Sequence, residues 1–168
     1  MGQLSIVSLG TLQLSLDTTP LTDFNSDKAR ALLTYLAIES DRAHHRENLV
    51  GLFWPEYPER RARHTLSQVL YNVRDVIGDR EALPSSQYLD VTRQTLRFRP
   101  ASDYWLDVDA LTACHDSLHQ RNARSTLEEL EAAIALYHGP FLAGFSLTDS
   151  PAFEEWLLLQ RERLERLT

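Results

Sequence analysis

FWPEYPERRARHTLSQVLYNVRDVIG, residues Phe53 to Gly78, predicts one long helix. Pro55 and Pro58 lie just before its start, where a missing backbone N–H costs little, and Gly78 lies just past its end. One face is an apolar stripe at helical spacing: Ala62, Leu66, Val69, Leu70, Val73 and Ile77. The opposite face is polar: Arg60, Arg61, His64, Ser67, Gln68, Tyr71 and Asn72. Guanidinium, amide and hydroxyl groups suit phosphates and base edges, so this stretch is a candidate recognition helix.

The segments around this helix predict a winged helix-turn-helix, an α+β fold. Short alternating runs indicate N-terminal strands at Leu4–Leu9, Leu12–Leu16 and Leu21–Phe24. Helical spacing predicts a core helix over Asp27–Ser40, capped by Asn25 or Ser26, and a short helix over Arg46–Trp54. After the polar helix, Tyr88–Val91 and Leu96–Phe98 predict a hairpin. In such a fold the third helix enters the major groove and the hairpin lies along the backbone.

Charge is divided unevenly along the chain. The net charge is −7, which taken alone argues against nucleic acid. Up to Pro100, however, twelve Lys and Arg balance twelve Asp and Glu, so the excess negative charge lies in the second part. A neutral first part with a local arginine cluster can bind a polyanion, because phosphate attraction depends on the local patch.

The second part of the chain, from Asp103, is predicted to be helical and acidic. Helical spacing indicates three segments, at Val108–Leu118, Ser125–Tyr137 and Ser150–Thr168. We therefore expect two domains, residues 1–100 and residues 101–168. The apolar positions of the last helix still repeat at residue 168, so we expect a fragment of a longer protein with a truncated helical domain.

Three stretches resemble the SARP-type (antibiotic regulatory protein) bacterial transcriptional activators. LFWPEYPERRARHTLSQVLYNVRDVIGD resembles the family's DNA-binding domain, and DKARALLTYLAIESDRAHHRENLVGLFWP matches its first two helices. ALYHGPFLAGFSLTDSPAFEEWLLLQRERLERL is similar to the bacterial transcriptional activator domain that follows. The motifs Gly139–Leu142 and Asp149–Trp156 are its most specific part.

This resemblance implies a winged helix like that of the OmpR and PhoB effectors, followed by an all-α, tetratricopeptide-like domain. It also implies a cytoplasmic activator that binds direct repeats in duplex promoter DNA and recruits RNA polymerase. Arg63 and Arg74 fall on arginine positions of the family's third helix. The hairpin QYLDVTRQTLRF departs from the Gly-Tyr-rich form common in the family. For the helical domain we expect dimerisation, polymerase contact or autoinhibition.

The candidate DNA-binding residues have distinct expected roles. Arg60, Arg61 and Arg63 would anchor phosphates near the helix N-terminus, where the macrodipole also attracts anions. Base edges would be read by His64, Ser67, Gln68 and Asn72. Arg93 at the hairpin tip would reach a minor groove, and Arg46 at the start of the second helix would touch the backbone. The alternatives are a solvated helix face paired with Glu56 and Glu59, and an exposed turn arginine; Trp54 is expected to be a core residue.

The sequence contains no recognisable catalytic, cofactor or metal motif. Cys114, His115 and His119 share a predicted helix, but no second pair at ligand spacing accompanies them, so they are interpreted as ordinary helix residues. No nucleophile elbow, phosphate loop or dinucleotide fingerprint is present. The single cysteine fits a reducing cytoplasm, and no apolar run is long enough to span a bilayer. Two further classes stay open: a protein-interaction module that does not bind DNA, and an RNA-directed winged helix.

Overall fold

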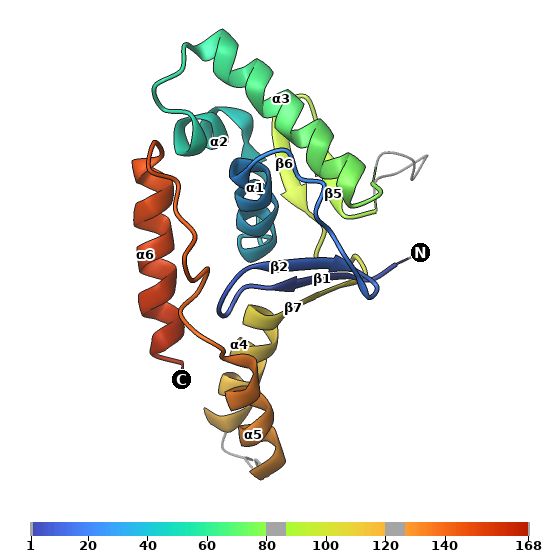
Figure 1. Ribbon diagram of the computed structural model, residues 1–168, viewed down its shortest axis with the longest axis vertical. Helices are drawn as coiled ribbons and strands as arrows, with labels where there is room; N and C mark the ends of the chain where they lie inside the picture. Colours follow the sequence, from blue (N-terminus) through green and yellow to red (C-terminus); the bar gives the residue numbers. More distant parts are fainter. Residues whose placement is uncertain (1, 80–86, 120–126, 168) are drawn as a thin grey trace.

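The computed structural model describes residues 2–79, 87–119 and 127–167, and it has a mixed α+β architecture (Figure 1). Its strands are β1 (Leu4–Val7), β2 (Gln13–Leu16), β3 (Thr19–Pro20), β4 (His44–His45), β5 (Leu89–Val91), β6 (Thr95–Phe98) and β7 (Tyr104–Leu106). Its helices are α1 (Asp27–Ile38), α2 (Arg46–Phe53), α3 (Glu59–Val76), α4 (Asp107–His119), α5 (Leu127–Leu136) and α6 (Pro151–Glu165).

The winged helix predicted from the sequence is confirmed by the order and packing of these elements. Helices α1 and α2 both pack against α3, and the hairpin β5–β6 follows α3 along the chain. The cap of α1 is Ser26, whose hydroxyl accepts a hydrogen bond from the Ala29 N–H at 3.2 Å. Gly78 follows α3 with φ of 75°, a left-handed conformation that favours glycine. Trp54 is buried, as predicted, in the turn between α2 and α3.

Three short strands differ from the prediction. The third strand is Thr19–Pro20 rather than Leu21–Phe24, and it lies at the edge of its sheet, where a proline is tolerated. His44–His45, which lies between the predicted helices Asp27–Ser40 and Arg46–Trp54, pairs with β6 and completes the sheet β4-β6-β5. Tyr104–Leu106, expected in a helical region, pairs in parallel with β1 and completes the sheet β3-β2-β1-β7. Segments of two or three residues carry no periodicity, so partners distant in the sequence determine them.

Strand β7 follows the predicted boundary between residues 100 and 101, yet it pairs with β1, so one sheet contains strands from both predicted domains. Asp107, at the start of α4, strengthens this connection. Its carboxylate accepts hydrogen bonds from the N–H groups of Ser8 and Leu9 at 2.8 and 2.7 Å and from the Ser8 hydroxyl at 2.9 Å. The division into domains 1–100 and 101–168 therefore stays a prediction.

Helix α6 lies beside α1 and α2, on the side away from the hairpin (Figure 1). Phe153 of α6 is fully buried, with its ring centroid 5.4 Å from that of Phe53. Ser150 occupies the N-cap position of α6, and its hydroxyl donates to the Phe53 carbonyl at 2.7 Å rather than capping the helix. The tetratricopeptide-like arrangement of the helical part stays a prediction, and the first residues of its predicted second helix, Ser125 and Thr126, lie outside the described residues.

Candidate nucleic-acid interface

Helix α3 exposes a continuous polar stripe. Arg60, His64, Ser67 and Tyr71 follow one another at spacings of four, three and four residues, and all four are exposed. Gln68 is exposed beside this stripe. The opposite side of the helix is in the core, where the hydrophobic residues are almost fully buried: Ala62, Leu66, Leu70, Val73 and Ile77. The predicted division of α3 into an apolar and a polar face is thus confirmed for these residues.

The arginines at the start of α3 have different surroundings. The Arg61 guanidinium lies 4.2 Å from the centroid of the Tyr57 ring, which orients it by a cation–π contact. Arg63 forms ion pairs with Glu59 at 2.8 Å and with Glu47 of α2 at 3.1 Å. Arg63 is thus paired with Glu59, one of the two partners of the expected alternative, and with Glu47 rather than Glu56. Within the described ranges Arg60 has no ion-pair partner.

The N-cap residue of α3 makes no side-chain capping hydrogen bond. Pro58 occupies the N-cap position, and a proline side chain offers no acceptor for the first backbone N–H groups of the helix. These N–H groups lie at the same end of the helix as Arg60 and Arg61, and the carboxylate in this first turn, Glu59, is paired with Arg63. Such an end attracts anions, phosphate groups among them.

The hairpin is fixed to the start of α2 through Arg46. Its guanidinium Nη2 donates to the Thr92 carbonyl at 2.9 Å, and its backbone N–H donates to the Gln94 carbonyl at 2.8 Å. Partial burial of the side chain lowers the pKa of Arg46. Arg93 lies exposed at the hairpin tip, between the two residues that Arg46 binds. Arg46 therefore has a structural role in addition to any contact with a ligand.

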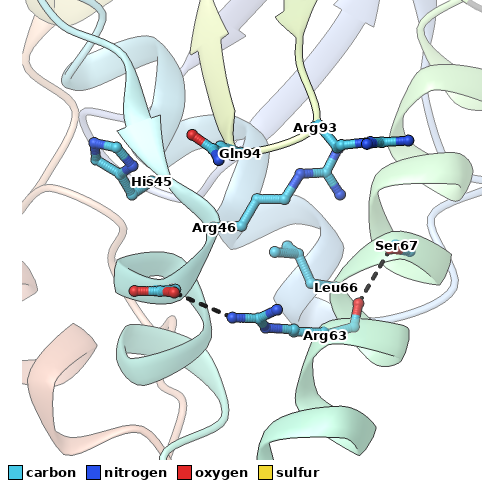
Figure 2. A pocket seen from close by; sticks show the side chains of 8 residues that line it. His45, Arg46, Arg63, Leu66, Ser67, Arg93 and Gln94 are labelled. Atoms are coloured by element: carbon cyan, nitrogen blue, oxygen red, sulfur yellow. Dashed lines mark hydrogen bonds and ion pairs between the residues drawn. The ribbon is translucent and has the colours of Figure 1, made fainter.

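A hollow of about 410 Å³ separates the hairpin tip from α3 (Figure 2). Arg46 and Arg93 border it on the hairpin side, and Arg63 and Ser67 border it on the α3 side. The complete lining is His45, Arg46, Glu47, Arg63, Leu66, Ser67, Arg93 and Gln94. The fold thus brings together four predicted site residues from three separate elements.

A second hollow lies on the other side of the stripe. Gln68 and Tyr71 border it together with Asp75 and the segment that precedes α1, at Asp23 and Asn25. Asp75 is exposed at the far end of the polar face, where a carboxylate repels phosphate. The exposed stripe of α3 therefore stands as a ridge between two hollows, one bordered by arginines and one by carboxylates.

Asn72 does not belong to the exposed face, and its expected role as a base reader is wrong. Its side chain is buried, with the Oδ1 accepting from the Asn25 N–H at 2.8 Å and the Nδ2 donating to the Asp23 carbonyl at 3.3 Å. The cause is the segment before α1, which packs over the edge of α3. Periodicity places Asn72 at the border between the two faces, and only the tertiary structure decides which side covers it.

Arg74 is half-buried at the C-terminal end of α3. Its Nε lies 3.9 Å from the Asp79 carboxylate, which also accepts a hydrogen bond from the Tyr88 N–H at 2.9 Å. This places Arg74 at the junction between α3 and the hairpin. Tyr71, in contrast, was not among the candidate residues, although its place in the polar stripe was readable from the spacing.

The local charge of this surface differs from that of the whole chain. Six arginines, at positions 46, 60, 61, 63, 74 and 93, lie in or beside it, against six carboxylates, at positions 23, 47, 56, 59, 75 and 79. The surface is thus neutral on balance although the chain carries −7, and three of its arginines border the hollow beside the hairpin. Among the described residues no group of three or more His, Cys, Asp or Glu is placed to hold a metal ion. No described helix is long and apolar enough to cross a bilayer.

Comparison with known proteins identifies the fold. No protein-family model matches the chain, and no curated protein matches it in sequence. The structure of Mycobacterium tuberculosis EmbR, a SARP-family regulator solved in complex with a low-affinity phosphopeptide, matches 99% of this chain with a TM-score of 0.76 and 24% sequence identity. The match covers 44% of the EmbR chain, so this chain spans less than half the length of that protein. The winged-helix fold implied by the SARP resemblance is confirmed.

Proposed function

We propose that this chain binds duplex DNA as the DNA-binding part of a SARP-type bacterial transcriptional activator. Helix α3 would enter the major groove and the hairpin β5–β6 would follow the backbone. One observation carries the proposal: the exposed stripe of α3 and the arginines of the α2 start and the hairpin tip border one hollow on the same side of the molecule. The EmbR fold match supports the same reading.

The site residues divide into two groups by chemistry. Arg60, Arg61 and the first N–H groups of α3 would bind phosphates at one end of the helix. Arg46, Arg63 and Arg93 would bind phosphates beside the hairpin, and Arg63 would exchange its carboxylate partners for the DNA backbone. Because its two ion pairs are exposed, they cost little to break, about 0–1 kcal/mol each.

The residues of the ridge would read sequence. Gln68 can bridge an adenine with its amide, and His64 and Ser67 can hydrogen-bond to neighbouring base edges. Asn72 is not included in this group, because its side-chain amide already forms hydrogen bonds to the backbone of Asn25 and Asp23.

The remaining features of the proposal come from the family resemblance. The target would be direct repeats at a promoter, with RNA polymerase as a protein partner and a homodimer as a possible assembly. The protein would act in the cytoplasm, without a cofactor and without catalysis. Helices α4–α6 would form the first part of a tetratricopeptide-like activator domain.

Selection from random duplexes by mobility shift tests this function. We expect one enriched sequence motif from the wild type. The Gln68→Ala variant should enrich the same motif with preference relaxed at one position, by about 1–3 kcal/mol of discrimination. A selection that enriches no motif, or a Gln68→Ala motif identical to that of the wild type, would contradict base reading by α3.

The two other function classes predict different results in the same assay. A protein-interaction module would give no enriched duplex, and its binding to a protein partner through an apolar interface would depend little on salt. An RNA-directed winged helix would prefer structured RNA over duplex DNA in direct competition.

A further inference from the structure

Tyr71 is an exposed aromatic side chain at the C-terminal end of the α3 ridge. Its side chain is 55% exposed, and within the described part of residues 1–100 it is the one large hydrophobic residue with such exposure. It continues the stripe of Arg60, His64 and Ser67 by one further turn. It borders the second hollow together with Asp23 and Asn25, and also a separate, third hollow that is lined by Arg46 and Val91.

If α3 enters a groove by its exposed stripe, Tyr71 enters with it. Side chains of the stripe would then face the base edges, while the arginines beside it would contact the phosphates. Ser67 and Gln68 lie one turn earlier on the helix, and their exposed side chains offer hydrogen-bonding groups. The side chain at this point differs from them because its ring presents an apolar surface that is rigid beyond two rotatable bonds.

Only one base presents an apolar group in the major groove: thymine, through its C5-methyl group. An exposed ring gains free energy by removing that methyl group from water, whereas it gains no comparable contact from cytosine, which has a hydrogen in the same place. The ring of Tyr71 therefore favours thymine through an apolar contact with the methyl group rather than through a hydrogen bond.

We propose that Tyr71 is a specificity-determining residue that recognises the C5-methyl group of a thymine in the bound duplex. This inference rests on the proposed function and adds to it a contact that the polar residues of α3 cannot make. It predicts that the selected DNA motif contains a thymine opposite the C-terminal half of α3, beside the position that Gln68 reads.

Replacement of thymine by deoxyuridine tests the inference, because it removes the methyl group and nothing else. Each thymine of the selected duplex is replaced in turn, and affinities are measured for the wild type, Tyr71→Phe and Tyr71→Ala. We expect one replacement to weaken wild-type binding about fourfold, the equivalent of about one buried carbon group. Tyr71→Phe should keep this loss, and Tyr71→Ala should bind thymine and deoxyuridine duplexes equally at that position.

Varying both the base and the protein separates a direct contact from a change in DNA shape. If the methyl group acts through DNA shape, deoxyuridine weakens the binding of Tyr71→Ala as much as that of the wild type. Three results would overturn the inference while leaving DNA binding intact. The selected motif could lack thymine, no replacement of thymine by deoxyuridine could weaken wild-type binding, or Tyr71→Ala could lose the same affinity on replacement as the wild type. If no duplex binds the wild type in a salt-dependent way, the proposed function fails and this inference fails with it. Unchanged unfolding of Tyr71→Ala in urea serves as the folding control, since the side chain is exposed.

Discussion

Asn72 stabilises the winged helix through two hydrogen bonds to the backbone of the segment before α1. Its amide is buried, so an alanine at this position would leave the Asn25 N–H and the Asp23 carbonyl without these partners. We predict that Asn72→Ala lowers the free energy of unfolding by about 1–3 kcal/mol, measured by urea denaturation.

Gln68→Ala is the matched control for this prediction, because Gln68 is an exposed amide one turn earlier on the same helix. Its unfolding free energy should stay within about 0.5 kcal/mol of the wild type. Equal stability of the two variants would mean that the Asn72 amide is not bonded as described.

Tyr104 should titrate at unusually high pH. Burial raises the pKa of Tyr104 to about 12, with a further contribution from the hydrogen bond that its hydroxyl donates to Asp109 at 2.9 Å. Because the pKa is raised in the folded state, the stabilising contribution of the phenol is fully present below pH 10.0 and is lost as the pH rises toward about 12.

The test is the tyrosinate absorbance of the wild type minus that of Tyr104→Phe. Asp109→Asn should lower the midpoint of this difference curve, because it removes a negative charge next to the phenol. A midpoint at the ordinary value of 10.0 would contradict the burial and the hydrogen bond.

At the scale of elements, the hairpin β5–β6 depends on Arg46 for its attachment to α2. The guanidinium binds the Thr92 carbonyl in the hairpin turn, whereas Arg93, the next residue in that turn, is exposed. We predict that Arg46→Ala speeds hydrogen exchange of the amides of β6 and the turn. Arg93→Ala removes the same charge and should leave the exchange unchanged. Equal exchange in both variants would show that Arg46 does not hold the hairpin.

The longer elements could be predicted from the sequence because each carries its own signal. Helix α3 has an apolar stripe, two prolines before it and Gly78 after it, so its face and its end were both readable. Strands β4 and β7 have two and three residues, and their pairing with β6 and β1 is decided by the tertiary structure. The same reason explains Asn72, which is covered by a segment about fifty residues away in sequence.

On the scale of the whole molecule, helix α6 is part of the structure that positions α3. Phe153 is fully buried between Phe53, Trp156 and Phe145, and the Trp156 indole donates to Glu39 of the α1 end at 2.9 Å. Phe53 ends α2 and immediately precedes the turn into α3. Any movement of α6 is therefore coupled to the turn between α2 and α3.

We predict that Phe153→Ala lowers the free energy of unfolding by about 3–5 kcal/mol, because it opens a cavity in this contact. The matched control is Leu158→Ala on the same helix, whose side chain is 56% exposed and whose loss should cost about 0.5 kcal/mol or less. A small effect of Phe153→Ala would mean that α6 does not pack on the winged helix in solution.

The candidate site was predictable in composition but not in arrangement. The arginine cluster and the polar stripe follow from spacing, and the resemblance placed them on the third helix of a winged helix. The hollow that joins Arg46, Arg63 and Arg93 depends on the hairpin turn binding the start of α2, a contact between residues that are 46 apart in the sequence.

The most direct test of the central claim is the salt dependence of duplex binding by the wild type, Arg60→Ala and Arg166→Ala. If α3 lies against DNA, log affinity falls linearly with log salt concentration, and Arg60→Ala reduces the slope by about one. Arg166→Ala removes the same charge from the exposed end of α6, far from the proposed interface, and should leave the slope unchanged. A wild-type affinity that does not vary with salt, or equal slopes for Arg60→Ala and Arg166→Ala, would contradict the assignment of α3 as a DNA-binding helix.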